Sequence, residues 1–458
     1  MSSPTPTHTR ERTGVSRLMG PVNTLVERFI PSALVFAIVL TVITMIGALL
    51  LTDAGPLDVV RSWGDGLAGL LAFMTQMALI LLLGYILANT GPVRALLLRL
   101  AAIPRGRVMP YVFVALVTAV SALLTWGLGL IVGAIMATQV AAAARRRGEK
   151  LHFPLLVAGG YSGMAVWHMG YSGSAPLTAA TPDSFLAEQL GGTIPLSDTI
   201  FSAWNLIILA VCLAVLAACY ALLAPKKGDP VHEMPDQQME DESITYTVET
   251  PADRLDASRL VTLVPGLLMA LYLVLHFRDG GTLTLDIVNW TFLTMVLLLV
   301  GNPFVLVELT KRGASNVGEI LLQFPLYAGI MGIMGGTGLI AVLSDSIVAV
   351  STPATFGVLA FLSAALVNFF VPSGGGQAAV QGPVLLTAAE QLGVDPEVAI
   401  MALSYGDQIT NLIQPFWALP LLAIARLRIR DILGYTMVVM LAIGTVLIVG
   451  LLVVGPTP

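Results

Sequence analysis

Charged residues are scarce in this sequence. Only 11% of its 458 residues are Asp, Glu, Lys or Arg, and the mean hydropathy is +0.86. Soluble domains carry about 25% charged residues, so the composition excludes a soluble globular protein. Apolar runs of about 20 residues recur along the chain, and this length predicts membrane-spanning helices rather than the shorter alternating strands of a membrane barrel.

Cysteine is almost absent as well. The only two cysteines, Cys212 and Cys219, lie seven positions apart on one predicted membrane helix. This separation along the helix axis is too large for a disulfide between them, so we expect both to pack in the core. The formal net charge is −5 and no basic patch is present, so no nucleic-acid partner is expected.

Seven apolar stretches have the length and composition of ordinary membrane spans. The first follows a polar arm, residues 1–30, and no small-residue cleavage site comes after it, so we interpret it as a retained span and not as a signal peptide. The seven stretches are residues 31–52, 67–91, 201–223, 259–277, 287–308, 318–341 and 432–456.

Four further apolar stretches are interrupted by glycine, proline or polar residues. Residues 108–144 surround TWGLG and residues 354–392 surround PSGGGQ; we interpret both as re-entrant hairpins that enter and leave on the same side. Residues 153–181 are interrupted at GYSGSAP and residues 395–427 at DQITNLIQP. These two are interpreted as discontinuous helices that cross the membrane.

The basic residues support this threading. With the amino terminus in the cytoplasm, 21 of the 23 Lys and Arg residues fall on the cytoplasmic side, all except Arg61 and Arg278. Such an excess is the positive-inside pattern of a multi-pass protein. The sequence therefore predicts a protein of the cytoplasmic (inner) membrane with its amino terminus inside and its carboxyl terminus outside.

The threading also predicts an inverted repeat. Two spans, a hairpin, a discontinuous helix and a closing span fill residues 31–223, and the same order with opposite orientation fills residues 287–456. Residues 224–258 form an acidic cytoplasmic linker, and the span at 259–277 connects the two halves. The predicted fold class is an all-α polytopic membrane protein with the architecture of an inverted-repeat secondary transporter.

Non-helical chain survives at membrane depth only where protein or a water-filled cavity covers it, so the four interruptions are expected to meet at a binding site. Their residues are small, neutral and rich in hydroxyl and amide groups, and they include no Lys or Arg. This composition suits a small carboxylate, with tryptophan rings around its apolar tail. The candidate substrate-binding residues are Thr125, Trp126, Gly127, Trp167, His168, Ser172, Gly173, Ser174, Ser373, Gly374, Gly375, Gly376, Gln377, Thr410, Asn411 and Gln414.

Two ionisable residues are predicted at membrane depth, His168 and Asp407. A charge in mid-helix costs at least about 2.5 to 3.5 kcal/mol, so we interpret both as a proton or sodium relay, together with Ser373 and Asn411. Sodium could bind near Ser373, Asp407 and Asn411, and no other cofactor is expected. As structural alternatives, His168 is a neutral core histidine, Asp407 is a helix cap, and the hydroxyls of Ser172 and Ser174 bond to their own helix.

Three motifs resemble the short-chain fatty acid transporter (AtoE) family of the ion transporter superfamily: WHMGYSGSAPL (167–177), NFFVPSGGGQAAVQGP (368–383) and YGDQITNLIQPFWALPLL (405–422). The resemblance extends from about residue 20 to the carboxyl terminus. It implies uptake of short carboxylates such as butyrate or acetoacetate, coupled to a cation, by a protein that forms a homodimer.

The resemblance adds Pro176, Pro372 and Gln408 to the residues of interest. The chain departs from the expected pattern at Ala378 and Ile409, where many members of the family are expected to carry tryptophan. Two smaller side chains would widen the pocket, so the departures concern the size of the substrate.

Two other functions remain as alternatives. The tetrapeptide GYSG occurs at 160–163 and 170–173, and with His168 as base it is compatible with an intramembrane serine hydrolase. A channel for small anions is the second alternative. Hairpins that open to opposite faces favour alternating access over a continuous pore, so we predict a transporter rather than a channel. Four-residue matches occur easily by chance in a glycine-rich chain, and His168 lies only four residues before Ser172, so we do not predict an enzyme.

Overall fold

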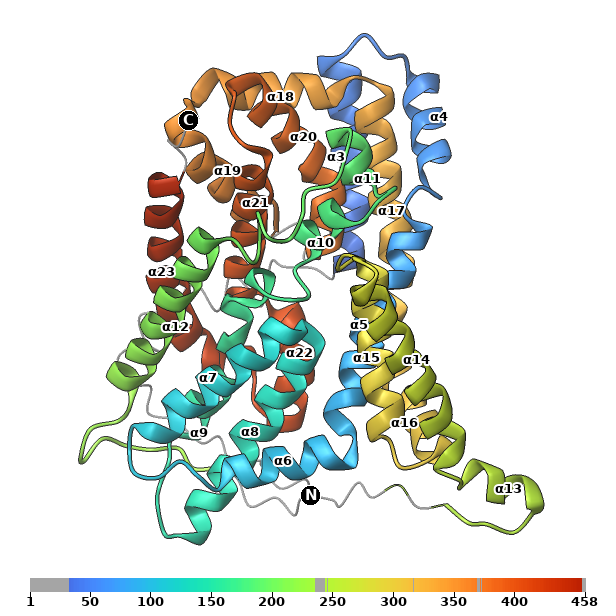
Figure 1. Ribbon diagram of the computed structural model, residues 1–458. Helices are drawn as coiled ribbons and strands as arrows, with labels where there is room; N and C mark the ends of the chain where they lie inside the picture. Colours follow the sequence, from blue (N-terminus) through green and yellow to red (C-terminus); the bar gives the residue numbers. More distant parts are fainter. Residues whose placement is uncertain are drawn as a thin grey trace, which may run out of the picture.

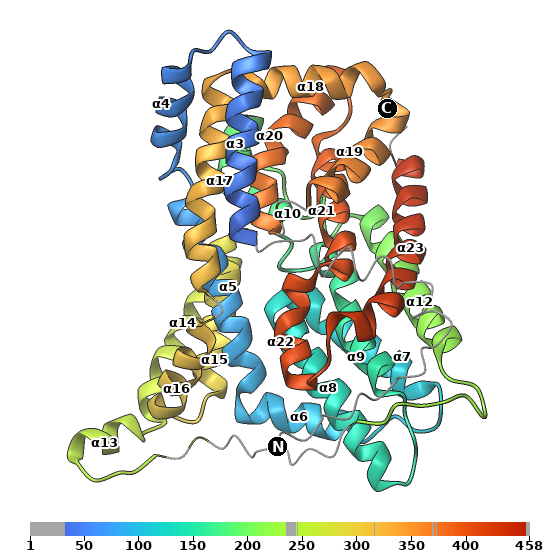
Figure 2. The same cartoon turned by 180° about the vertical axis from the view of Figure 1, so that it is seen from behind.

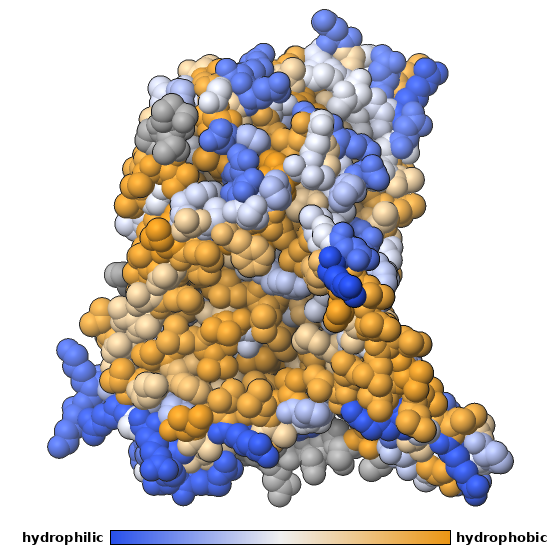
Figure 3. Space-filling model, in the orientation of Figure 1, coloured by the Kyte–Doolittle hydropathy of each residue, from blue (hydrophilic) through white to orange (hydrophobic). Residues whose placement is uncertain are grey.

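The computed structural model describes residues 33–234, 244, 246–315, 317–368, 371 and 373–454, and the regular structure in these ranges is entirely helical. The predicted arm at 1–30, Pro372 and most of the acidic part of the linker lie outside them. Five of the described helices are long and apolar enough to cross a membrane, and one bent pair could form a sixth span. Figure 3 shows a broad apolar surface with hydrophilic residues gathered toward both ends. The prediction of an all-α polytopic membrane protein is therefore confirmed.

The helices of the amino-terminal half are α3 (Ala33–Leu51), α4 (Pro56–Gly66), α5 (Leu71–Asn89), α6 (Gly91–Ala101), α7 (Met109–Leu124), α8 (Trp126–Arg146), α9 (Phe153–Ser162), η1 (Gly163–Ala165), η2 (Trp167–Met169), α10 (Ser174–Ala180), α11 (Phe185–Leu190) and α12 (Ala203–Leu223). Those of the carboxyl-terminal half are α13 (Pro251–Asp256), α14 (Leu260–Arg278), α15 (Leu285–Leu299), α16 (Pro303–Ala314), α17 (Gly318–Gly336), α18 (Leu339–Val350), α19 (Pro353–Asn368), α20 (Gly374–Leu392), α21 (Pro396–Thr410), η3 (Asn411–Ile413), α22 (Pro415–Ala425) and α23 (Ile429–Val454).

Two helical hairpins approach the middle of the molecule from opposite ends. Helices α7 and α8 rise from the end near α6, whereas α19 and α20 descend from the end near α18 (Figures 1 and 2). The first hairpin turns at Thr125, whose backbone is extended between the two helices, and Ser373 has an extended backbone just before α20. Residues 108–144 thus contain two helices and a central turn, and residues 354–392 contain α19 and α20, which are two separate helices.

The two stretches interpreted as discontinuous helices are also divided. Helix α9 ends at Ser162, and the 3-10 turns η1 and η2 precede α10. Helix α21 ends at Thr410, and the 3-10 turn η3 precedes α22. These irregular segments lie between the hairpin tips at mid-height of the molecule (Figure 1).

Two predicted spans have a different geometry from the one expected. Hydropathy predicts one span over residues 318–341, but α17 ends at Gly336 and α18 leaves it at an angle of 79°. Gly338 adopts a left-handed conformation, φ 79°, which allows this turn. The stretch 287–308 divides where Asn302 caps the new helix α16 through a hydrogen bond to the N–H of Val305. Hydropathy does not detect either change of direction.

The start of the linker is bound to the end of the molecule near α6 through His152. Its N–H donates to the hydroxyl of Tyr111 (2.7 Å), and its Nε2 lies 3.0 Å from the hydroxyl of Tyr435. Its Nδ1 accepts a hydrogen bond from the N–H of His232 (3.1 Å), whose carbonyl accepts one from Phe153 (2.8 Å). His152 therefore binds α7 through its backbone N–H, and its ring, in the neutral form, joins α23 to the linker.

Burial, with a smaller effect of the neighbouring His232, lowers the pKa of His152 to about 4. In an unfolded chain this pKa is about 6.5. The contribution of neutral His152 to the free energy of unfolding is therefore fully present above pH 6.5 and is lost as the pH falls toward 4, by as much as about 3 kcal/mol. We expect the thermal unfolding midpoint of the purified protein to fall less steeply between pH 7.5 and 4.5 in His152→Gln than in the wild type. His276→Gln changes a histidine at the surface and serves as control; equal slopes in all three proteins would contradict this assignment.

Candidate functional site

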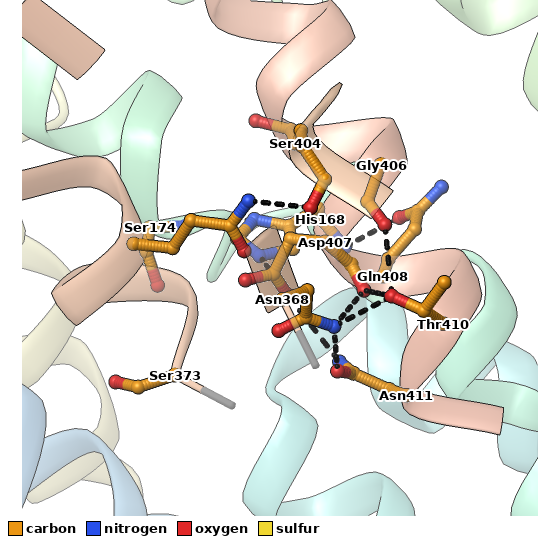
Figure 4. Close-up of polar contacts among 12 residues, drawn as sticks. His168, Ser174, Asn368, Ser373, Ser404, Gly406, Asp407, Gln408, Thr410 and Asn411 are labelled. Carbon is orange, nitrogen blue, oxygen red and sulfur yellow. Dashed lines mark hydrogen bonds and ion pairs between the residues drawn. The ribbon is translucent and has the colours of Figure 1, made fainter. Parts of the chain in front are cut away.

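The two discontinuous helices meet at a buried pair of ionisable side chains. His168 from η2 and Asp407 from α21 are 1% and 2% exposed, and His168 Nε2 lies 3.2 Å from Asp407 Oδ1. The backbone N–H of His168 also donates to Gln408 Oε1 at 3.0 Å. Figure 4 shows this pair among the polar contacts of α21. Sequence-distant segments therefore bring their two membrane-depth ionisable residues into direct contact.

The first residue of α10 fixes the proton arrangement of this histidine. The N–H of Ser174 donates to His168 Nδ1 at 3.2 Å, so Nδ1 is an acceptor and carries no proton. The proton of the neutral ring is then on Nε2, where it donates to Asp407. A second proton on His168 would break the hydrogen bond from Ser174. Within the pair, Asp407 is therefore the group that can take up a proton without loss of an existing hydrogen bond.

The second carboxylate oxygen of Asp407 supports this assignment. Oδ2 is buried and has no hydrogen-bond partner among the residues that the structure describes. An ionised carboxylate buried with one free oxygen is strongly destabilised. Asp407 is therefore poised to bind a proton or a cation, or to face a donor group of a substrate.

Asn368 connects the second hairpin to α21. Its Nδ2 donates to the carbonyl of Asp407 (2.7 Å) and to Thr410 Oγ1 (2.8 Å), and its carbonyl accepts a hydrogen bond from Gln414 Nε2 (2.7 Å). Its Nδ2 also lies 2.8 Å from Asn411 Oδ1. Asn368 was missing from the predicted site, although a lone amide that ends an apolar half-helix before a glycine turn was a usable signal.

The amide of Asn411 can be satisfied in two orientations. In one, its oxygen accepts from Asn368 and its nitrogen lies 3.4 Å from Asp407 Oδ1. In the other, its oxygen accepts from Trp167 Nε1 at 3.1 Å. The hydroxyl of Tyr161 donates a hydrogen bond to the backbone carbonyl of Asn411. The backbone of η3 is therefore held in place as well as the side-chain amide. Asn411 therefore lies between the ionisable pair and the tryptophan ring.

The tip of the first hairpin is closed by Ser172. Its hydroxyl accepts a hydrogen bond from the N–H of Trp126 (3.2 Å), the first residue of α8, and so joins the segment after η2 to the start of that helix. Trp126 packs edge-on against Trp417, with 5.2 Å between ring centroids, and lies 6.2 Å from Trp167. Three tryptophans thus form one aromatic cluster beside the ionisable pair. Thr125 Oγ1 is buried without a partner in the described part of the chain.

Glycines at the tip of the second hairpin permit close packing against aromatic rings. A methyl group added at Gly374 would lie 2.6 Å from His168 Nε2, one at Gly375 would lie 2.7 Å from the ring of Phe73, and one at Gly376 would lie 2.5 Å from the ring of Tyr327. All three glycines have ordinary helical backbone conformations, so a left-handed turn does not explain them. Instead, the neighbouring rings leave no space for a side chain at these positions. The backbone of this tip covers the ionisable pair.

Not all predicted residues gather at the pair. Ser373 lies apart from the network in Figure 4, and its hydroxyl accepts a hydrogen bond from the N–H of Gly376 (3.2 Å). Gln377 turns back along its hairpin, where its Nε2 donates to the carbonyl of Ala364 (2.8 Å). Gly127 and Gly173 lack a side chain, which lets the chain pack closely against the backbone carbonyls of Leu81 and His168 respectively. Among the described residues no group of three or more His, Cys, Asp or Glu side chains could hold a metal ion.

The geometry contradicts the hydrolase alternative. The two ring nitrogens of His168 face Asp407 and Ser174 N, so neither is available to Ser172. The serine of the first GYSG, Ser162, is hydrogen-bonded to the hydroxyl of Tyr220 (2.7 Å). A serine nucleophile with an adjacent base is therefore absent from both tetrapeptides.

Known proteins resemble this chain over nearly its whole length. Residues 14–454 match the family described as short chain fatty acid transporter. A protein of Escherichia coli (strain K12), provisionally named a short-chain fatty acid transporter, is 39% identical over 441 residues, which cover 95% of this chain and 99% of that protein. A protein of Haemophilus influenzae with the same name is 36% identical over 447 residues, with the same coverage of both chains.

A solved structure shares the fold. The YdaH transporter of Alcanivorax borkumensis aligns with a TM-score of 0.56 over 92% of this chain and 97% of that chain, at 17% identity. The family, the two relatives and this solved structure are all described as transporters and not as enzymes. The resemblance inferred from the three motifs is thus confirmed: the chain belongs to the short-chain fatty acid transporter family.

Proposed function

We propose that this protein is a secondary active transporter that moves short-chain monocarboxylates such as butyrate or acetoacetate across the cytoplasmic membrane together with a proton. The observation that carries the proposal is the buried contact between His168 and Asp407, at the point where both discontinuous helices break. A titratable pair inside a membrane protein is functional by default. In this proposal the proton binds to Asp407, because the tautomer imposed by Ser174 leaves this carboxylate as the proton acceptor of the pair.

The surroundings of the pair suit a small acid. Helices α8 and α20 begin at the two hairpin tips, and helix N-termini offer N–H groups and a positive dipole end to an anion. Described side chains at the breaks include no Lys or Arg, so a carboxylate would be held by N–H and amide groups. The cluster of Trp126, Trp167 and Trp417 would enclose a short alkyl chain. Ala378 and Ile409, both buried, replace the tryptophans expected in many family members, and in this proposal the smaller side chains admit more than the smallest acids.

The opposed hairpins are compatible with alternating access. In this proposal the α19–α20 tip, whose glycine backbone covers the pair from the α18 end, opens Asp407 to one side of the membrane, and the α7–α8 tip opens it to the other. The amino terminus is cytoplasmic, as the basic residues indicate. A channel would need both tips open at once.

Uptake of labelled butyrate into proteoliposomes tests this function. An inward proton gradient is expected to drive saturable accumulation in vesicles with the protein, and a sodium gradient at equal pH is expected to drive none. Protein-free vesicles are the essential control, because neutral butyric acid crosses lipid unaided. Accumulation driven only by sodium would refute proton coupling, and unitary currents under voltage clamp would indicate a channel.

A further inference from the structure

Asn205 on α12 is a buried asparagine that the proposed mechanism does not use. It has no exposed surface, and its amide makes hydrogen bonds in three directions. Nδ2 donates to the carbonyls of Ile200 (2.6 Å) and Met169 (3.4 Å). Oδ1 accepts from the hydroxyl of Tyr405 (2.7 Å), which is itself fully buried. Both donors of the amide are therefore occupied, and its oxygen is engaged.

The partners of Asn205 are neighbours of the ionisable pair. Met169 directly follows His168 in η2, and Tyr405 precedes Asp407 by two residues in α21. Asn205 thus joins the backbone beside the histidine to the helix that carries the aspartate. On the other side of the same turn, Gln408 accepts the N–H of His168. The turn is held to α21 from both sides, through Asn205 and through Gln408.

The turn needs such support because it is irregular. Residues 163–169 form only the two short 3-10 segments, which have poorer hydrogen-bond geometry than an α-helix. The distance between His168 Nε2 and Asp407 Oδ1, 3.2 Å, is at the long end of the range for a hydrogen bond. A small displacement of the turn would therefore separate the pair.

We infer that Asn205 is a positioning residue that keeps His168 within hydrogen-bonding distance of Asp407 and so maintains coupling of the proton to the carboxylate. This inference rests on the proposed function. It assigns a role to α12, which otherwise contributes no group to the pair. Asn205 acts through the backbone of η2 and through Tyr405, and it touches neither substrate nor proton.

The test compares two modes of transport in proteoliposomes. Gradient-driven uptake of butyrate requires proton release, whereas exchange of labelled for unlabelled butyrate at equal pH requires only movement of the loaded protein. Asn205→Ala is expected to lower the ratio of gradient-driven uptake to exchange about three- to tenfold, with an unchanged KM for exchange. Tyr405→Phe removes one of the hydrogen bonds and should lower the ratio in the same direction by a smaller factor.

Asn289→Ala is the matched control. Asn289 on α15 is equally buried, and its amide donates to the carbonyls of Gln76 and Leu285, away from α21 and η2. The ratio in this variant should equal that of the wild type. A normal ratio in Asn205→Ala together with a disturbed ratio in Asp407→Asn overturns this inference alone. Wild-type gradient-driven uptake in Asp407→Asn overturns the proposed function and this inference together.

Discussion

Asp407→Asn is expected to lose gradient-driven accumulation of butyrate while it retains exchange. Asparagine keeps an oxygen that accepts the hydrogen bond from His168 Nε2, but it cannot bind or release a proton. It resembles the protonated aspartate, so the loaded protein should still move its substrate in both directions. Because the variant has no proton to bind and release, gradient-driven accumulation should fall to the level of protein-free vesicles.

A conservative substitution elsewhere provides the control for this prediction. Asp286 is exposed at the start of α15 and accepts a hydrogen bond from Gln76 Nε2 (2.8 Å). Asp286→Asn should accumulate butyrate like the wild type, measured as initial rates in vesicles that contain equal amounts of protein. Equal accumulation by Asp407→Asn and the wild type would remove Asp407 from the coupling mechanism.

The positions of the helix breaks could be predicted from the sequence because their signals are local. GYSGSAP and PSGGGQ place glycine and proline inside apolar stretches, and His168 and Asp407 are polar residues at depth next to two of the breaks. Any chain that buries such segments must satisfy their backbone groups within the protein. The contact between His168 and Asp407 follows from the convergence of the two breaks.

Other features depend on packing that hydropathy does not encode. Phe73 and Tyr327 read as ordinary apolar residues of α5 and α17, yet they bound the glycine tip. The hydroxyl of Ser172 accepts a hydrogen bond from the N–H of Trp126, 46 positions away. The sequence suggested contact with a substrate or with its own helix, and neither interpretation included Trp126. Asn205 lies in an apolar span, and its role becomes visible only when Tyr405 and Met169 are placed beside it.

Gly374→Ala is expected to reduce both modes of transport. The added methyl group would lie 2.6 Å from His168 Nε2 and 2.7 Å from Trp167 Cη2, so it would clash with both buried rings. Either the tip withdraws or His168 moves away from Asp407. Forcing a methyl group into a packed site costs about 1 to 3 kcal/mol, or about 5- to 150-fold in rate. Gly335→Ala is the control, because this helical glycine of α17 has open space around it.

A compensating substitution distinguishes packing at the tip from general damage to the fold. A methyl group at Gly375 would meet the ring of Phe73, so Gly375→Ala is also expected to slow uptake, and Phe73→Leu should restore part of the rate by removing ring atoms from that contact. Phe73→Leu should not rescue Gly374→Ala, whose methyl group meets His168 instead. Rescue of both variants, or of neither, would show that the tip does not depend on these individual ring contacts. Uptake by the single and double variants in one vesicle preparation measures the difference.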